Sequence, residues 1–167
     1  MLIHRHPPLR RRLLLPAVAA VLLTAAGCSP APEPTAAVQR DGTGYAVVVP
    51  LCPDGTVLFV SVRDRARDVN TGWSVSSEGA EATMERYPLF TTPPGWKTEH
   101  DDLTALEPGA AYRVSVVSTS RTTDAVVGFT LADLEKLKDD EVLTYKKGGG
   151  TTRQKADKFR ANALKLC

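Results

Sequence analysis

Histidine is nearly absent from this sequence, which excludes several kinds of active site. Three histidines occur among 167 residues: His4 and His6 stand near the N-terminus, and only His100 lies further along the chain. Residues 28–167 therefore contain one histidine. One histidine cannot form a multi-histidine metal site, and it leaves one imidazole for general acid–base catalysis. No serine stands in a G-x-S-x-G or S-x-x-K motif, and no G-x-x-x-x-G-K-[ST] phosphate loop occurs. We therefore predict no catalytic residues, no metal site and no cofactor.

Long apolar runs are lacking as well. The longest apolar stretch, Leu13–Gly27, has 15 residues and contains Pro16, whereas a membrane-spanning helix needs about 20. The alternative of a spanning helix therefore fits less well than a secretion signal. Such a signal consists of a positive segment, an apolar segment and small residues before the cleavage site. The flanking residues that fit are Arg10, Arg11 and Arg12 before the stretch, and Ala25, Ala26 and Gly27 before Cys28.

This arrangement, ending in a cysteine, resembles the signal segment of bacterial lipoproteins. The resemblance covers about the first 28 residues and implies that residues 1–27 are removed as a signal peptide. It also implies that Cys28 carries acyl chains, palmitate among them, which anchor the protein in the lipid bilayer. The expected location is the cell membrane, on its extracytoplasmic face. The run Arg10–Leu14 fits both a twin-arginine signal and an ordinary signal, so the export route stays open.

A strong charge of one sign is also missing. The whole chain has 21 Lys and Arg against 19 Asp and Glu, a net charge of +2. Four arginines and no acidic residue precede residue 28, so residues 28–167 carry 17 basic and 19 acidic side chains, a net charge of −2. Nucleic-acid-binding proteins present a strongly basic face. We therefore predict no nucleic-acid partner.

Cysteine is scarce, and its three positions have different expected roles. An odd number of cysteines in an exported protein normally leaves one thiol unpaired. Acylation of Cys28 would leave two thiols, and Cys52 and Cys167 would then form a structural disulfide in an oxidising compartment. The alternative is a free Cys167 that pairs with a partner protein or reacts as a redox thiol. No C-x-x-C motif surrounds Cys167.

The remaining chain divides into a tether, a strand-rich part and an extension. Residues 28–43 contain three prolines and few bulky side chains, which predicts a flexible tether. Residues 44–131 contain short β-type runs separated by turn signals, which predicts an antiparallel sandwich. Within 56–62, alternation places Val57, Phe59 and Ser61 on one face and Leu58, Val60 and Val62 on the other. The predicted strands are 45–51, 56–62, 72–77, 82–87, 96–103, 112–118 and 125–131.

One segment points to a narrower fold class. Residues 103–116, LTALEPGAAYRVSV, resemble the segment that joins strands E and F of fibronectin type III domains. The resemblance implies a tyrosine corner, in which the ring of Tyr112 packs in the core and its hydroxyl binds nearby backbone. It also implies that Leu106 lies in the core and that Val114 and Val116 face inward. The expected fold is mainly β, an antiparallel immunoglobulin- or fibronectin-like sandwich with a short helical C-terminal extension.

The extension, residues 132–167, is expected to pack a helix on the sandwich. Thr130 and Asp133 have the spacing of a helix cap, residues 142–145 read as a short strand, and residues 146–150 read as an exposed loop. The glycines of that loop lack the order of a phosphate-binding motif. A last helix is predicted from Thr151, with an apolar face formed by Ala156, Phe159, Ala163 and Leu166.

Two further segments could carry function. His100 is flanked by Glu99, Asp101 and Asp102, but successive residues of a strand point to opposite faces, so we predict a charged edge rather than a metal site. Residues 87–96 contain three prolines and three aromatic residues, and aromatic loops on rigid sandwiches bind partners. The alternative is that these aromatic side chains cover one end of the core. The candidate binding loop comprises Tyr87, Phe90 and Trp96.

Together these features predict a membrane-anchored extracytoplasmic lipoprotein that acts as a non-catalytic binding or accessory module of the cell envelope. Its expected partners are the lipid bilayer, through acylated Cys28, and an envelope protein. The alternative is an enzyme or a small-ligand-binding lipoprotein whose site no motif reveals. A deep pocket with two facing carboxylates would favour that alternative, and an exposed aromatic patch would favour the binding module.

Overall fold

The computed structural model describes residues 34–67, 71–78, 84–119 and 125–167. The predicted signal peptide 1–27 and the acylation site Cys28 lie outside the described residues and stay predictions. In the described ranges, no helix combines the length and the apolar character that a membrane span requires.

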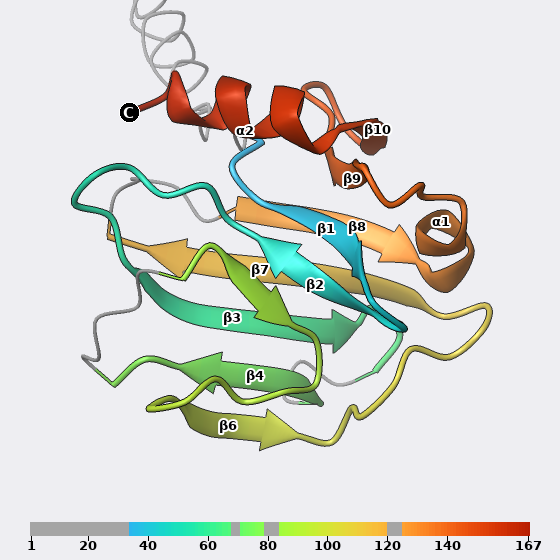
Figure 1. Cartoon of the computed structure of the whole chain (residues 1–167). Helices are drawn as coiled ribbons and strands as arrows, with labels where there is room; N and C mark the ends of the chain where they lie inside the picture. The colour runs from blue at the N-terminus through green and yellow to red at the C-terminus, as the bar shows by residue number, and fades with distance from the viewer. Residues whose placement is uncertain (1–33, 68–70, 79–83, 120–124) are drawn as a thin grey trace, which may run out of the picture. The chain divides into compact units, whose positions relative to one another are not determined.

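Within these ranges ten strands form two antiparallel five-stranded sheets, so the chain is mainly β as predicted (Figure 1). The first sheet has the order β10-β9-β1-β2-β5, and the second has the order β6-β4-β3-β7-β8. The first sheet comprises β1 (Ala37–Asp41), β2 (Gly44–Val48), β5 (Arg86–Pro88), β9 (Glu141–Tyr145) and β10 (Thr151–Lys155). The second comprises β3 (Val57–Asp64), β4 (Gly72–Ser76), β6 (Lys97–Asp101), β7 (Ala111–Ser118) and β8 (Ala125–Thr130). Two short helices complete the fold, α1 (Leu131–Glu135) and α2 (Ala156–Leu164).

The main core lies between the inner faces of the two sheets and is rich in valine. Branched side chains suit this position because they fit a pleated surface and pack well against a facing sheet. Buried valines alternate with outward residues along β3 and β7, as the period of two in a strand requires. The core includes Val38, Val47, Val60, Val62, Val75, Val114 and Val127, with Trp73, Tyr87, Tyr112 and Phe129 as its aromatic members.

The tyrosine corner predicted around Tyr112 is present. The Tyr112 ring is fully buried, and its Oη accepts a hydrogen bond of 2.6 Å from the backbone N–H of Glu107. Val114 and Val116 face inward, as expected. Leu106, however, is only partly buried, and Leu103, 4% exposed, is the more deeply buried leucine of this turn.

The predicted limits of the tether and of the sandwich were wrong. Residues 28–43 were expected to be a tether, but β1 begins at Ala37 and lies between β9 and β2 in the first sheet. The sandwich was expected to end at residue 131, but β9 pairs with β1, and β10 pairs with β9. These strands depend on pairing between distant segments, which a local sequence pattern does not contain.

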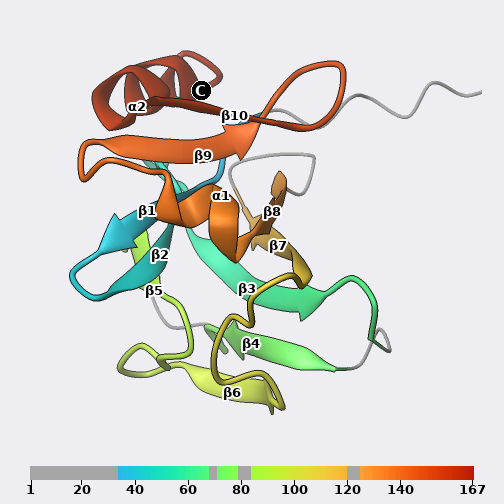
Figure 2. The same ribbon diagram turned by 90° about the vertical axis from the view of Figure 1, so that its right-hand side faces the viewer.

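The C-terminal helix packs on the outer face of the first sheet, as expected (Figures 1 and 2). It begins at Ala156 rather than Thr151, because residues 151–155 pair with β9 as strand β10. Phe159 is fully buried and forms a second small core with Ala37 and Val142. Beyond the helix, Cys167 forms a disulfide with Cys52, which is the pairing predicted from the number of cysteines.

Candidate binding groove on the second sheet

The aromatic side chains of 87–96 pack on the core and do not form the predicted binding loop. Tyr87 is fully buried and donates a hydrogen bond of 2.6 Å to the carbonyl oxygen of Met84, and its burial raises its pKa far above the ordinary value. Trp96 packs on Tyr87 with ring centres 5.1 Å apart, and Phe90 meets the edge of Trp73 at 6.0 Å. The segment therefore forms no exposed aromatic patch.

The charged segment around His100 forms strand β6 at the edge of the second sheet, and all five of its residues are exposed. Charged side chains on an edge strand discourage pairing with another chain. In the parts of the chain that the structure describes, no group of three His, Cys, Asp or Glu residues could hold a metal ion. The loop Lys146–Gly150 forms the turn between β9 and β10.

A pair of arginines lies on two neighbouring strands of the outward face of the second sheet. Arg63 on β3 and Arg113 on β7 are directly opposite each other in the register, and both are exposed. Their strand neighbours Val62 and Val114 are buried in the core, so the two arginines project outward. Like charges placed directly opposite on neighbouring strands are destabilising. Within the described ranges, neither arginine forms an ion pair or a side-chain hydrogen bond.

Glycines flank this arginine pair on both sides. Gly72 on β4 is opposite Arg63, and Gly128 on β8 is opposite Arg113. A Cβ at position 72 would lie 2.5 Å from the carbonyl oxygen of Val62, so only glycine fits there. The row across the sheet is therefore Gly-Arg-Arg-Gly, with two long basic side chains standing beside residues that have none.

The next row on this face, two residues along the strands, consists of serines. Ser74, Ser61 and Ser115 are direct partners across β4, β3 and β7, and so lie on the same face as the arginine pair. Ser74 is 2% exposed, and among the described residues its Oγ has no hydrogen-bond partner. Ser61 is 3% exposed. Small hydroxyl-bearing residues thus form the floor of this face beside the arginines.

A bulge in β3 decides which of its residues reach this face. The pairing of β3 with β7 shifts between Val57 and Phe59, so Val57 joins Val60 and Val62 in the core. A bulge adds one residue to a strand and changes the side on which the following residues lie. The prediction that Val57 shares a face with Phe59 and Ser61 was therefore wrong.

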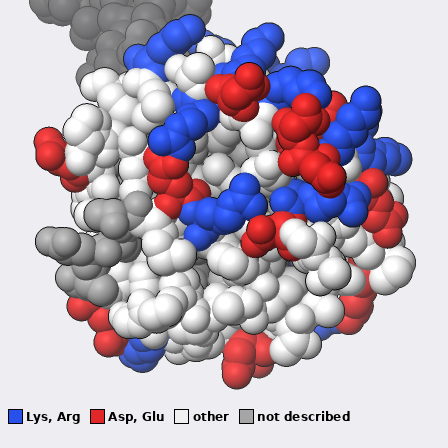
Figure 3. All heavy atoms as spheres, viewed as in Figure 1, with Lys and Arg blue, Asp and Glu red and all other residues white. Residues whose placement is uncertain are grey.

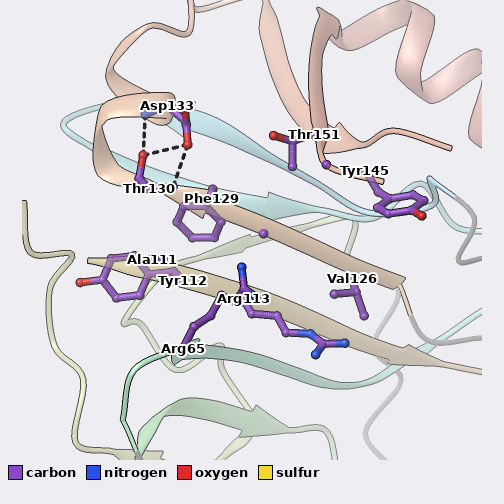
Figure 4. A pocket seen from close by; sticks show the side chains of 12 residues that line it. Arg65, Ala111, Tyr112, Arg113, Val126, Phe129, Thr130, Asp133, Tyr145 and Thr151 are labelled. Carbon is purple, nitrogen blue, oxygen red and sulfur yellow. Dashed lines mark hydrogen bonds between the residues drawn. The ribbon is translucent and has the colours of Figure 1, made fainter. Parts of the chain in front are cut away.

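Two adjoining hollows follow the outward face of the second sheet. They have volumes of about 460 and 420 Å³, and both are lined by Arg65 and Arg113. We call the two together the arginine groove. The first hollow runs along β8 toward Tyr145 and Thr151 (Figure 4), and the second crosses β7 and β3 to Phe59 and Val117.

The arginine groove is basic because most of its cations lack a carboxylate partner. Arg67 pairs with Asp64 and Glu107, each at 3.3 Å, but Arg63, Arg65 and Arg113 form no ion pair with any described residue. Several basic side chains elsewhere are paired, and Figure 3 shows basic and acidic side chains side by side on another face of the molecule. Pairs on the first sheet and α2 include Arg86 with Asp41, Lys155 with Asp140 and Arg160 with Glu85.

Each hollow contains a single carboxylate that is already engaged locally. In the first, Asp133 accepts hydrogen bonds from the N–H and the hydroxyl of Thr130, and these bonds lower the pKa of Asp133 below its usual value. In the second, Asp64 pairs with Arg67 and accepts from the N–H of Ala66. Among the described residues that line the two hollows, no two carboxylates face each other, which is the arrangement that would favour an enzyme.

Motifs and composition alone do not mark Arg63, Arg65 or Arg113 as site residues. The alternation in 112–118 does place Arg113 away from the core, which is a signal that could have marked it. Its position opposite Arg63 depends on the register between two strands about fifty positions apart, and one sequence does not contain that register.

Comparisons with known proteins add no assignment. No protein-family model matches the chain, and no curated protein and no solved structure matches it.

Proposed function

We propose that this chain is a membrane-anchored extracytoplasmic lipoprotein whose folded part is a non-catalytic binding module of the cell envelope. The lipoprotein-like signal and Cys28 support the location and the anchor. The Cys52–Cys167 disulfide also supports a location outside the cytoplasm, because disulfides persist in oxidising compartments.

The observation that carries the binding role is the unpaired arginine pair. Arg63 and Arg113 face each other on a surface of glycines and serines, without a carboxylate to offset their repulsion. A purely structural surface would gain stability from a neutral or acidic residue at either position. An anionic ligand bound between the guanidinium groups would offset the repulsion, since guanidinium groups bind carboxylates and phosphates through two parallel hydrogen bonds.

We also propose that the sandwich belongs to the immunoglobulin- or fibronectin-like class. The β3–β4 and β7–β8 hairpins of the second sheet, the pairing of β1, β2 and β5 in the first, and the tyrosine corner support this class. Two features depart from it: β6, the strand before the corner, pairs with β4, and β9 and β10 extend the first sheet.

The binding role can be tested in living cells with a photo-crosslinking amino acid in place of Ser115. Because Ser115 lines the arginine groove, illumination is expected to give an adduct of higher mass that disappears when Arg113→Gln is added. The same amino acid in place of Lys158, an exposed position on α2, is the control and is expected to give no such arginine-dependent adduct. Absence of any Ser115 adduct would contradict the proposal.

The anchor requires a separate measurement. Mass spectrometry of the chain extracted from the membrane fraction is expected to find an N-terminal, diacylglyceryl-modified Cys28. An unmodified Cys28 in a soluble chain would contradict the lipoprotein assignment.

A further inference from the structure

We propose that the arginine groove binds an extended acidic segment of a partner protein, which runs across the outward face of β8, β7 and β3 and places its carboxylates on Arg113 and Arg63. This inference rests on the proposed binding function and assigns the chemistry of its partner.

The two hollows give such a segment a path across the strands. Among the described residues, β8 is the last strand of the second sheet and pairs with β7, and its outer edge lies close to β9 and β10 of the first sheet. The larger hollow begins at this edge, and its far wall is formed by Tyr145 and Thr151 of the first sheet (Figure 4). The smaller hollow continues this path across β7 and β3 to Arg63, so side chains of one extended segment can enter both hollows.

The basic side chains lie where alternate side chains of that peptide would reach. Figure 4 shows the Arg113 side chain extending along the hollow toward Val126 on β8. Gly128, the partner of Arg113, carries no side chain that would separate the guanidinium group from the edge. Arg63 lies one strand further in, beside the serine row. A segment that runs across the strands meets Arg113 and then Arg63, which lie in one row of the sheet. Alternate side chains of an extended segment point the same way, so two acidic residues separated by one residue can approach this pair together.

The remaining groups of the groove favour a peptide over a small or densely charged anion. Val126 and Phe129 line the first hollow, and Phe59 and Val117 line the second, so apolar side chains find contacts between the cations. Each hollow also contains one carboxylate, which disfavours a ligand with closely spaced phosphates. Ser61 and Ser115, which line the second hollow, add hydroxyl groups beside the arginines.

The test uses the purified full chain and a fluorescein-labelled octapeptide of alternating valine and aspartate, followed by fluorescence anisotropy. We expect saturable binding of this peptide and none of the matched peptide with lysine in place of aspartate. Arg113→Gln and Arg63→Gln should each weaken binding about tenfold or more, because each removes a charge-assisted pair. Lys158→Gln removes one exposed positive charge on α2 and is expected to change affinity less than about twofold.

A second variant tests the path over β8 without removing a charge. A Cβ at Gly128 would meet its nearest atom, the Tyr112 carbonyl oxygen, at 3.8 Å, so Gly128→Val is compatible with the strand. Its side chain would occupy the groove beside Arg113 and should weaken binding about tenfold or more, while the near-ultraviolet circular dichroism stays unchanged.

Three results would overturn the inference. They are no saturable binding of the acidic peptide, binding that is unaffected by Arg113→Gln and Gly128→Val, and inorganic phosphate that displaces the peptide completely at equal concentration. If the peptide fails while the arginine-dependent Ser115 adduct forms in cells, the binding module stands and the acidic-peptide assignment falls. If both fail, the proposed function falls as well.

Discussion

Tyr112 connects the turn before β7 to the core through one hydrogen bond, from the N–H of Glu107 to its Oη. Tyr112→Phe keeps the buried ring and leaves that N–H without its partner, so we expect the free energy of unfolding to fall by about 1–3 kcal/mol. Chemical denaturation measures the change. Tyr45→Phe is the control, because no described residue forms a hydrogen bond with the Tyr45 hydroxyl; it should change stability by less than about 0.5 kcal/mol. Equal effects of the two variants would contradict the tyrosine corner.

Arg63 and Arg113 are expected to reduce the stability of the free protein. Arg63→Thr removes the like-charge contact and introduces a residue that suits a strand, so the free energy of unfolding should rise by about 0.5 kcal/mol at low salt. The gain should shrink as salt is added, because salt screens exposed charges. Arg153→Thr on β10 loses a hydrogen bond to the carbonyl oxygen of Lys136 and should give no gain. A gain for Arg63→Thr that is independent of salt would indicate that repulsion is not its cause.

At the scale of single elements, α1 depends on a capping box whose strength varies with pH. Thr130 donates to the Asp133 carboxylate at 2.9 and 2.8 Å, and the N–H of Asp133 donates back to the Thr130 hydroxyl at 3.3 Å. These bonds favour the charged carboxylate and lower the pKa of Asp133 below its ordinary value of 3.8. The stabilisation is therefore complete above the unfolded-state pKa and is lost as pH falls through the lower folded-state pKa.

We expect Asp133→Asn to be less stable than the wild type at neutral pH, with the difference disappearing as pH falls below 3.8 and through the folded-state pKa. Thermal unfolding between neutral pH and about pH 2 measures this convergence. Asp54→Asn, at an exposed side chain that forms no ion pair with any described residue, is the control and should follow the wild type throughout. A difference for Asp133→Asn that persists unchanged in acid would show that the charge of Asp133 contributes nothing.

Local patterns predicted most strands because alternation and turn residues are properties of short segments. The segments around Trp73, Tyr112 and Val127 became strands close to their expected bounds. Strand β1 was missed because its five residues follow a proline-rich stretch and gain their burial from β9 and α2. Strand β10 was missed because its charged sequence resembles a helix start, and only pairing with β9 extends it.

The candidate site was less predictable than the fold because it depends on contacts between distant segments. The aromatic residues of 87–96 were predicted to form a binding loop because of their residue type, but in the structure they pack in or against the core. The arginine groove arises from register, from the bulge in β3 and from glycines on neighbouring strands, which are relations between distant segments.

At the scale of the whole molecule, the disulfide joins the loop after β2 to the last residue and closes a loop of 115 residues. In the loop-entropy model, replacing both cysteines by alanine should lower the free energy of unfolding by about 4–5 kcal/mol. Denaturation of the double variant and of the oxidised wild type measures the loss. Hydrogen exchange should also accelerate in α2, the element nearest the released end, more than in β3 and β7. Unchanged stability would contradict a structural role for this pair.

The central claim is that the arginine groove is occupied in the envelope, and hydrogen exchange in isolated native membranes tests it most directly. About 1 M NaCl, which reduces the screening length to roughly 3 Å, should release a partner held by Arg63 and Arg113. We predict that residues 111–118 and 125–130 then exchange faster while α2 does not change, and that the Arg63→Gln/Arg113→Gln variant exchanges at the faster rate before and after salt. Equal exchange of β7 and β8 in the wild type with and without salt would contradict the account.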